Sequence, residues 1–346
     1  MKRRQLAWIV AALAILAALA AALYHRHSGR IGATAYSFSF GTMGTVAGCV
    51  FYTADSALAD AGYAAVRREF DRVSAACNLH DPNSELSKLN REAGKEFFVC
   101  SELLWQILVE ARAAHRYSNG AFDITVKPLM NLRGFYRKRD KLPSSREIAE
   151  TLKLVGLDKL EWDDARHAVR FKKPGMALDL GGIAKGYALD LAAKAVLDLG
   201  IRRGVIDLGG NLFLLPEPPP GKTHYQIGIR SPSGEGDSGE FLELPGNCAI
   251  STSGSYERFV VLEGKRCGHV VDPATGDAPY REYSVTAVAP TGIKSDWLSS
   301  SAFLRGKELA DKLECELPGV KFRFTYPGYC MKPRSNRDNP AAVKEP

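Results

Sequence analysis

Two copies of Asp-Leu-Gly-Gly, Asp179–Gly182 and Asp207–Gly210, combine a carboxylate with a glycine turn. The first copy leads into an Ala- and Leu-rich run that predicts a helix to about Leu199, with Lys185 in its first turn. Glycine lets a backbone approach a ligand closely, and the unpaired N–H groups of a helix start favour phosphate. The set indicates a phosphate-bearing ligand held with a metal ion, although a glycine-capped connection would have the same pattern. Short apolar runs before the two copies predict strands at Met176–Leu178 and Gly204–Ile206.

A second group of oxygen-bearing side chains stands at Ser295-Asp296-Trp297-Leu298-Ser299-Ser300, where a last helix is predicted over 296–314. Asp296 and Ser300 are four residues apart, so on a helix they share one face. One interpretation is N-capping by Ser295 or Asp296. The other is a pair of hard oxygen ligands for magnesium, which usually shares its coordination sphere with substrate phosphates.

Three shorter motifs allow both a structural and a functional interpretation. Met43-Gly44-Thr45 stands between two predicted strands and fits a tight turn or a ligand contact. Asp123 precedes an expected β-run at 124–126, where it could bond to local backbone or face a ligand. His269 precedes the turn signal Asp272-Pro-x-x-Gly276 and is either a satisfied surface histidine or a functional residue.

The N-terminus predicts export. Lys2, Arg3 and Arg4 precede the uncharged, mostly apolar run 5–24. About twenty such residues span a bilayer, and the basic flank favours an N-terminus left in the cytoplasm. We expect an uncleaved anchor at the inner membrane with the domain on the periplasmic side, or a periplasmic protein if the segment is cleaved. The predicted organisation is 1–24 anchor or signal, 25–35 linker, 36–330 a single domain, and 331–346 a disordered basic tail.

The predicted fold is α+β with mixed or antiparallel sheets and flanking helices, because strands and helices do not alternate regularly. Earlier helices are expected at 55–78, 101–118 and 144–155, and strands within 36–52, 160–170, 226–230, 241–244, 248–251, 259–263 and 284–289.

Charge and cysteine spacing exclude some functions. The formal net charge of +7 is not gathered in a basic stripe with aromatic residues, so nucleic acid is not an expected partner. The seven cysteines have no CxxC spacing, which argues against zinc and iron–sulfur sites. Cys315 and Cys330 flank a short segment and are the first candidates for a disulfide.

Taken together, the motifs resemble the FAD:protein FMN transferases, the ApbE family, from about Phe40 to Leu313. The resemblance rests on the joint order of several segments rather than on any single one. They are Met43-Gly44-Thr45, Ser84-Glu85-Leu86-Ser87-Lys88-Leu89-Asn90, Gly120-Ala121-Phe122-Asp123 leading to Pro128-Leu129, Asp179 to Tyr187, Asp207 to Asn211, and His269 to Gly276.

The resemblance implies a magnesium-dependent enzyme that transfers FMN from FAD to a threonine or serine of an acceptor protein and releases AMP. It implies an acceptor that is a flavoprotein subunit of an electron-transfer complex. Residues that match FAD contacts are Met43, Ala121, Phe122, Asp123, Asp179, Lys185 and Val270, and those that match magnesium (Mg²⁺) ligands are the Gly182 carbonyl, Asp296 and Ser300. His269 and Lys185 are the candidate catalytic residues.

Two positions depart from the family pattern. His80 stands where the family often has a tyrosine against the flavin, and Ser300 stands where threonine is usual; a serine hydroxyl can still coordinate magnesium. Two alternatives use the same residues: a magnesium-dependent FAD pyrophosphatase that forms FMN and AMP, and an FAD-binding protein without turnover.

Overall fold

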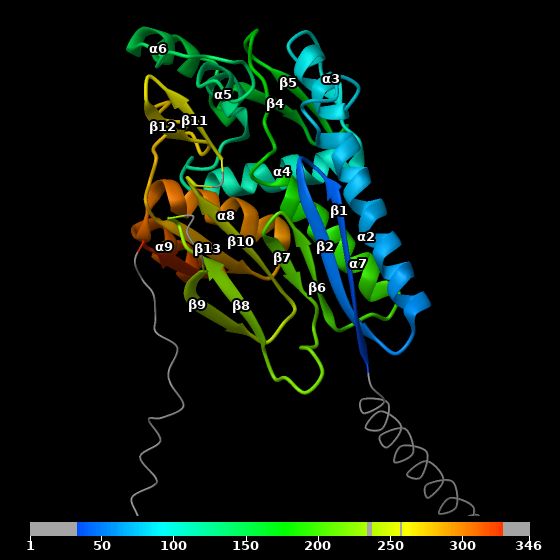
Figure 1. Cartoon of the computed structure of the whole chain (residues 1–346). Helices are drawn as coiled ribbons and strands as arrows, with labels where there is room; N and C mark the ends of the chain where they lie inside the picture. The colour runs from blue at the N-terminus through cyan, green and yellow to red at the C-terminus, as the bar shows by residue number, and fades with distance from the viewer. Residues whose placement is uncertain (1–32, 234–236, 257, 328–346) are drawn as a thin grey trace, which may run out of the picture.

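The computed structural model describes residues 33–233, 237–256 and 258–327. Its centre is a seven-stranded antiparallel sheet in the order β1-β2-β6-β7-β10-β13-β14 (Figure 1). The strands are Thr34–Thr42 (β1), Thr45–Thr53 (β2), Gly204–Leu208 (β6), Asn211–Leu214 (β7), Cys248–Gly254 (β10), Ser284–Ala289 (β13) and Lys321–Thr325 (β14). The predicted α+β class is confirmed, and β1 begins inside the range expected as a linker.

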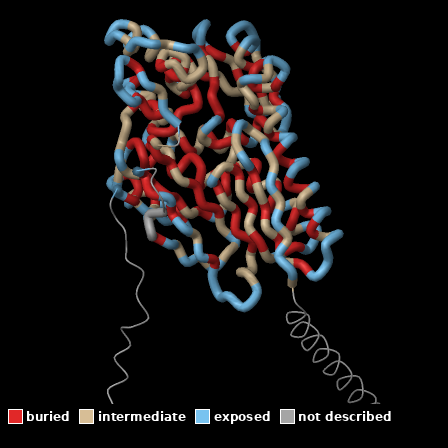
Figure 2. Tube along the Cα trace, in the orientation of Figure 1, coloured by how far each residue is buried: buried red, intermediate tan, exposed pale blue. Residues whose placement is uncertain are grey.

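Three helices lie side by side on one face of this sheet: α2 (Ser56–Cys77), α7 (Ala184–Asp198) and α8 (Gly292–Arg305). Buried residues line the interface between these helices and the strands (Figure 2). Phe51, Phe70 and Trp297 are among the large side chains buried in this layer. Burial of one aliphatic or phenyl side chain stabilises the fold by roughly 1.5–3 kcal/mol. The helix pair α7 and α8 is therefore fixed relative to the sheet.

Most of the smaller helices and strands lie toward the upper end of the molecule, and one hairpin, Tyr225–Arg230 with Asp237–Leu244, lies near its lower end (Figure 1). The remaining helices are α3 (Glu85–Glu92), α4 (Glu102–Tyr117), α5 (Lys127–Leu132), α6 (Ser145–Leu152) and α9 (Lys307–Glu316). The remaining strands are β3 (Phe98–Val99), β4 (Leu160–Asp163), β5 (Ala168–Phe171), β8 (Tyr225–Arg230), β9 (Asp237–Leu244), β11 (Phe259–Leu262) and β12 (Lys265–Gly268).

The early helices begin where side-chain caps predict. The side chains of Asp55, Ser101 and Ser144 accept hydrogen bonds from the first-turn N–H groups of α2, α4 and α6. Such a cap stabilises a helix start by about 1 kcal/mol. The Met43-Gly44 turn is also confirmed as the two-residue connection of the β1–β2 hairpin, with φ of 48° and 70°.

Three local predictions are wrong. Residues 176–178 form no strand, because the Leu178 backbone pairs with the Asn90 side chain through bonds of 2.7 and 3.0 Å. Residues 124–126 form the 3₁₀ helix η1 (Ile124–Val126) instead of a β-run, because the Asp123 carboxylate caps it and α5 follows.

The third error concerns the last helix. Helix α8 begins at Gly292, so neither Ser295 nor Asp296 is its N-cap. The carboxylate of Asp190 on α7 accepts the Gly292 and Ile293 N–H groups instead, at 2.5 and 2.9 Å. The predicted single helix is broken at Gly306, where φ is +76°, and continues as α9.

Several predictions fall outside the described residues: the anchor, most of the linker, the basic tail and Cys330. Within the described part of the chain, no helix combines the length and apolar character needed to cross a membrane. Cys315, the other half of the suggested disulfide, is exposed and unpaired with any described cysteine.

Candidate active site

The first glycine turn is held by its own carboxylate. Asp179 Oδ1 accepts the Gly181 N–H at 2.9 Å, and Asp179 Oδ2 accepts the Tyr136 hydroxyl at 2.7 Å. The Asp179 N–H donates to the Ile124 carbonyl at 2.7 Å, which joins the turn to η1. The turn opens into α7, whose N-cap residue Ile183 makes no side-chain cap bond. The Ala184 N–H donates to the Leu180 carbonyl at 2.9 Å, and Lys185 follows in this first turn.

Helices α7 and α8 approach unusually closely near this turn. A Cβ atom on Gly186 would lie 2.1 Å from the Gly292 carbonyl oxygen, so only glycine fits at the crossing. The Gly186 N–H donates to Asp296 Oδ2 at 3.0 Å. The close crossing therefore brings the α8 carboxylate to the first turn of α7.

Asp296 is almost fully buried and lies between the two glycine-turn segments. Its Oδ1 accepts the side-chain amide of Asn211 at 2.9 Å, and Asn211 directly follows the second Asp-Leu-Gly-Gly copy. Burial raises the pKa of Asp296, and the positive charge of Lys185 and the two hydrogen bonds oppose that rise. The two copies thus have different roles: the first opens α7, and the second positions the amide that orients Asp296.

A chain of hydroxyl groups sets the direction of Ser300. Ser299 Oγ donates to the Asp296 carbonyl at 2.9 Å, so its proton is used. The 2.9 Å contact between Ser253 and Ser299 then requires Ser253 to donate, and the 3.2 Å contact between Ser300 and Ser253 requires Ser300 to donate. The oxygen lone pairs of Ser300 are left for another partner.

Gly182 lies against this hydroxyl. A Cβ atom on Gly182 would be 3.7 Å from Ser300 Oγ and 3.2 Å from the Phe122 ring. The predicted metal ligands Gly182, Asp296 and Ser300 all line one cavity with Lys185. They come from segments more than a hundred residues apart in sequence and are brought together by the fold.

His269 also lines this cavity. Its N–H and its Nδ1 lie 3.2 and 3.0 Å from the Arg258 carbonyl oxygen. Because a carbonyl only accepts, Nδ1 carries the proton and Nε2 remains an acceptor. The side chain keeps some exposure, but protein atoms crowd the ring, and this desolvation lowers the pKa of His269 to about 4. The imidazole is therefore a neutral base at physiological pH.

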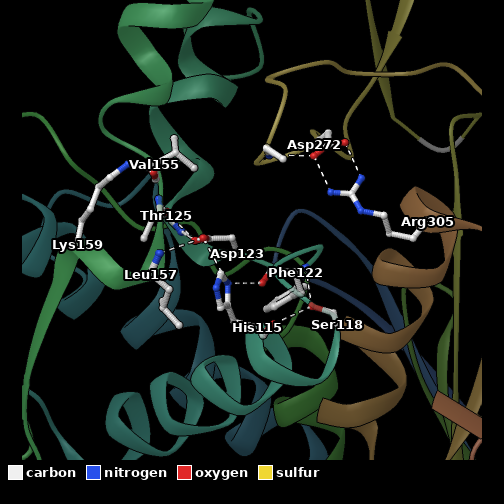
Figure 3. Close-up of polar contacts among 12 residues, drawn as sticks. His115, Ser118, Phe122, Asp123, Thr125, Val155, Leu157, Lys159, Asp272 and Arg305 are labelled. Carbon is white, nitrogen blue, oxygen red and sulfur yellow. Dashed lines mark hydrogen bonds and ion pairs between the residues drawn. The ribbon is translucent and has the colours of Figure 1, made fainter. Parts of the chain in front are cut away.

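The segment Ala121–Asp123 forms another wall of the cavity, and its carboxylate is used internally (Figure 3). Asp123 Oδ1 accepts the Thr125 N–H and hydroxyl at 2.8 and 2.6 Å, and Oδ2 accepts the Leu157 N–H at 3.1 Å. His115 Nδ1 lies 3.1 Å from the Phe122 carbonyl. The structural interpretation of Asp123 is thus confirmed, while a ligand contact by Asp123 stays a prediction.

An ion pair connects the His269 loop to α8 (Figure 3). The Arg305 guanidinium, at the end of α8, binds both carboxylate oxygens of Asp272 at 2.5 and 2.9 Å. The Asp-Pro-x-x-Gly turn thereby fixes His269 relative to the helix that carries Asp296.

A second cavity adjoins the first and contains the remaining predicted residues, Met43 and His80. The two cavities share Tyr136, Asp179, Gly181, Lys185 and Arg258. All predicted site residues therefore line one continuous region. The first cavity contains Ala121, Phe122, Asp123, Asp179, Gly182, Lys185, His269, Val270, Asp296 and Ser300.

Several lining or supporting residues were not assigned a role from sequence: Asn211, Ser253, Arg258 and Tyr136. Asn211 ends a recognised motif, so its position was a usable signal. Tyr136 and Ser253 stand in no recognised motif, and their position depends on tertiary contacts. Among the described residues, no cluster of three or more His, Cys, Asp or Glu side chains could hold a metal ion, so the candidate ligand set depends on hydroxyl and carbonyl oxygens.

Comparison with known proteins gives a consistent assignment. The family model described as the ApbE family matches residues 43–324. An FAD:protein FMN transferase of Treponema pallidum is 30% identical over 258 residues, covering 71% of this chain and 71% of the relative. Another FAD:protein FMN transferase, from Haemophilus influenzae, is 30% identical over 247 residues, covering 69% and 70%.

Solved structures agree with this comparison. The crystal structure of the ApbE protein of Thermotoga maritima superposes with a TM-score of 0.75 at 28% identity, covering 85% of this chain and 97% of that one. A mutant of the flavin transferase ApbE from Vibrio cholerae gives a TM-score of 0.72 at 26% identity, covering 85% and 98%. The match spans almost all of the described fold and both cavities, and the chain belongs to the ApbE family.

Proposed function

We propose that this chain transfers FMN from FAD to a serine or threonine hydroxyl of an acceptor flavoprotein and releases AMP, with a magnesium ion in the site. The observation that carries the proposal is the convergence of Asp296, Ser300 and the Gly182 backbone beside Lys185. Relatives matched over more than two thirds of this chain are FAD:protein FMN transferases, which supports the same reaction.

The candidate ligands fit a hard divalent cation. Asp296 offers a buried carboxylate whose charged form is disfavoured by desolvation, and a nearby cation would relieve that cost. The hydroxyl chain leaves the lone pairs of Ser300 unoccupied, and magnesium binds such oxygens together with substrate phosphates. A bound magnesium ion would neutralise negative charge on the diphosphate.

The chain's own residues supply the other steps. At the start of α7, the N–H group and the ammonium of Lys185 would bind the diphosphate, since a backbone N–H group and a positive charge both favour phosphate. His269 Nε2 would accept the proton of the acceptor hydroxyl as its oxygen attacks the phosphorus of the FMN half. The new oxygen–phosphorus bond joins FMN to the acceptor, and the broken diphosphate bond releases AMP.

The location is a separate part of the proposal and rests on the sequence of residues 1–24. The basic flank and the apolar run support tethering to the inner membrane with the catalytic domain on the periplasmic side. The acceptor would then be a flavoprotein subunit of an electron-transfer complex facing the same compartment.

The test uses the purified full-length chain in detergent with FAD, MgCl₂ and a candidate acceptor protein. Transfer gives a fluorescent band that survives denaturing electrophoresis and an FMN-sized mass increase on a serine or threonine. Free FMN and AMP without an adduct would favour the pyrophosphatase alternative, and unchanged bound FAD would favour a binding protein.

A matched pair of variants tests the metal ligands. Asp296→Ala should abolish magnesium-dependent turnover while FAD binding without metal persists, because only the cation site loses its carboxylate. Asp311→Ala, which removes an exposed carboxylate from α9, is the control. Equal turnover in Asp296→Ala and the control would remove the metal assignment.

A further inference from the structure

The β11–β12 hairpin has one buried face and one exposed face. Leu262 and Cys267 belong to the buried cluster under the hairpin. On the other face, Phe259 and Val261 occupy alternate positions of β11 and are 39% and 56% exposed. The water-facing side of an antiparallel pair normally carries polar side chains, so these two apolar residues mark a candidate contact surface.

An aromatic and an arginine side chain extend this exposed face. The rings of Phe259 and Tyr280 meet edge to face, with centroids 5.9 Å apart. The Arg266 guanidinium carbon lies 5.1 Å from the Phe259 centroid, and Arg266 Nη1 donates to the Tyr280 hydroxyl at 3.3 Å. Aromatic residues and arginine are enriched in protein interfaces, and side chains that are already held lose little freedom on binding. We call Phe259, Val261, Arg266 and Tyr280 the hairpin surface.

The surroundings of the hairpin surface are basic. Lys265 is exposed in β12, and the hairpin tip is joined to the loop 137–141 because the Glu263 N–H donates to the Asp140 carbonyl at 3.3 Å. Against the exposed carboxylates of Glu263 and Asp140, the hairpin and this loop carry more exposed basic side chains: Arg137, Lys138, Lys141, Arg258, Lys265 and Arg266. This charge favours a partner with acidic side chains.

Both ends of the hairpin meet at the candidate active site. Arg258 precedes β11 and lines both cavities, while His269 follows β12 and donates its N–H to the Arg258 carbonyl at 3.2 Å. Each strand has four residues and is therefore about 13 Å long. Even a small protein contact covers roughly 500 Å² on each partner, which is about 25 Å across. A protein that brings a hydroxyl to His269 Nε2 can therefore cover the hairpin as well.

The position of the hairpin favours a protein over a lipid surface. Strand β1 starts with Thr34 at the lower end of the molecule, whereas β11 and β12 lie toward the upper end (Figure 1). A chain tethered through the residues that precede Thr34 would hold the hairpin away from the bilayer.

We propose that the hairpin surface is the docking site for the acceptor flavoprotein, which contacts it through an apolar patch bordered by acidic side chains. This inference rests on the proposed function, in which a protein hydroxyl receives FMN. Docking removes Phe259 and Val261 from water and holds the acceptor hydroxyl beside His269. The hairpin thus selects the protein that is modified, separately from the residues that bind FAD.

The experiment measures the KM for the acceptor that gains the adduct in the transfer test, with full-length protein in detergent at saturating FAD and MgCl₂. Val261→Asp places a carboxylate in the apolar contact and should raise this KM by about tenfold. Lys265→Glu reverses an exposed charge and should raise the KM by about fivefold at low salt. The effect of Lys265→Glu should shrink at high salt, because salt screens exposed charges. The kcat and the Kd for FAD should stay at their wild-type values in both variants.

The matched controls are Val99→Asp and Lys222→Glu. Val99 and Lys222 are exposed residues of the same two types, and they line neither cavity. Both controls should keep the wild-type KM, and melting temperatures confirm that all four variants are folded. A raised KM accompanied by weaker FAD binding would show that the hairpin acts through the FAD site, which would overturn the docking inference.

The remaining outcomes separate the docking inference from the proposed function. Wild-type protein that forms no adduct would refute the proposed function and the docking inference with it. Wild-type protein that forms the adduct, with control-like KM values in both hairpin variants, would overturn only the docking inference. Loss of self-association in analytical ultracentrifugation with an unchanged KM would assign the surface to a second copy of the chain instead. A KM increase seen only in micelles that contain phosphatidylglycerol would assign it to lipid and also overturn the inference.

Discussion

The crossing of α7 and α8 at Gly186 gives the sharpest prediction about the assembled site. In Gly186→Ala, the new Cβ atom would lie 2.1 Å from the Gly292 carbonyl oxygen and 2.5 Å from its carbon. Both are backbone atoms, so no side-chain rotation can relieve the contact. Reaching an ordinary contact distance requires the two helices to part by roughly 1 Å.

The magnitude follows from overpacking and from one hydrogen bond. Overpacking a tight interior costs about 1–3 kcal/mol, which lowers Tm by roughly 2–5 °C for a chain of this size. The same displacement lengthens the 3.0 Å bond from the Gly186 N–H to Asp296 Oδ2. Loss of a bond that orients a metal ligand costs about 10- to 100-fold in metal affinity.

The assay measures Tm by calorimetry and Mn²⁺ affinity by electron paramagnetic resonance with FAD present. The control is Gly94→Ala, because a Cβ atom at Gly94 would meet nothing within 4 Å. A Gly186→Ala protein with the control's Tm and Mn²⁺ affinity would refute the claim that this crossing positions Asp296.

Three further predictions concern single side chains. The pKa of His269 is lowered to about 4, mainly by burial, so activity should rise as pH increases through about 4–5 and then stay level toward neutrality. This acid limb of the pH profile should vanish in His269→Gln. A limb that is unchanged in the variant would assign the base to another residue. Ser253→Ala breaks the hydroxyl chain and should weaken Mn²⁺ binding by about tenfold without changing metal-free FAD binding. Ser301→Ala removes a hydroxyl that donates to the Trp297 carbonyl and should not weaken Mn²⁺ binding, and equal losses in both serine variants would contradict the ordered chain. Burial raises the pKa of Asp190 to about 6, although the hydrogen bonds from the Ile293 and Gly292 N–H groups oppose that rise. The contribution of Asp190 to the free energy of unfolding is therefore complete below the ordinary carboxylate pKa of 3.8 and is lost as pH rises through about 6. The Tm of wild type minus that of Asp190→Asn should therefore fall between pH 4 and 6.5, and a flat difference would show that Asp190 does not titrate in this range.

Local sequence patterns predicted the elements that carry the site better than the contacts between them. The glycine turn and the apolar periodicity indicated α7, and the four-residue spacing placed Asp296 and Ser300 on one helical face. The start of α8 was missed because its cap comes from Asp190, about a hundred residues earlier. No local pattern contains that information.

The same distinction separates the predicted and the missed site residues. The predicted site residues all line the two cavities, whereas Tyr136 and Ser253 reach them through a loop and a sheet strand with no marked pattern. Residues 176–178 look like a strand because they are apolar, but the Asn90 side chain takes the backbone bonds that a neighbouring strand would have made. A tertiary partner therefore overrode the local preference.

The Asp296 carboxylate draws its two partners from Gly186 and Asn211, which precede it by 110 and 85 residues. During synthesis on the ribosome, the segment with the glycine turns emerges well before the carboxylate that must complete the site. An unfinished polypeptide therefore lacks a complete site, and it cannot act on FAD until the final helices have docked.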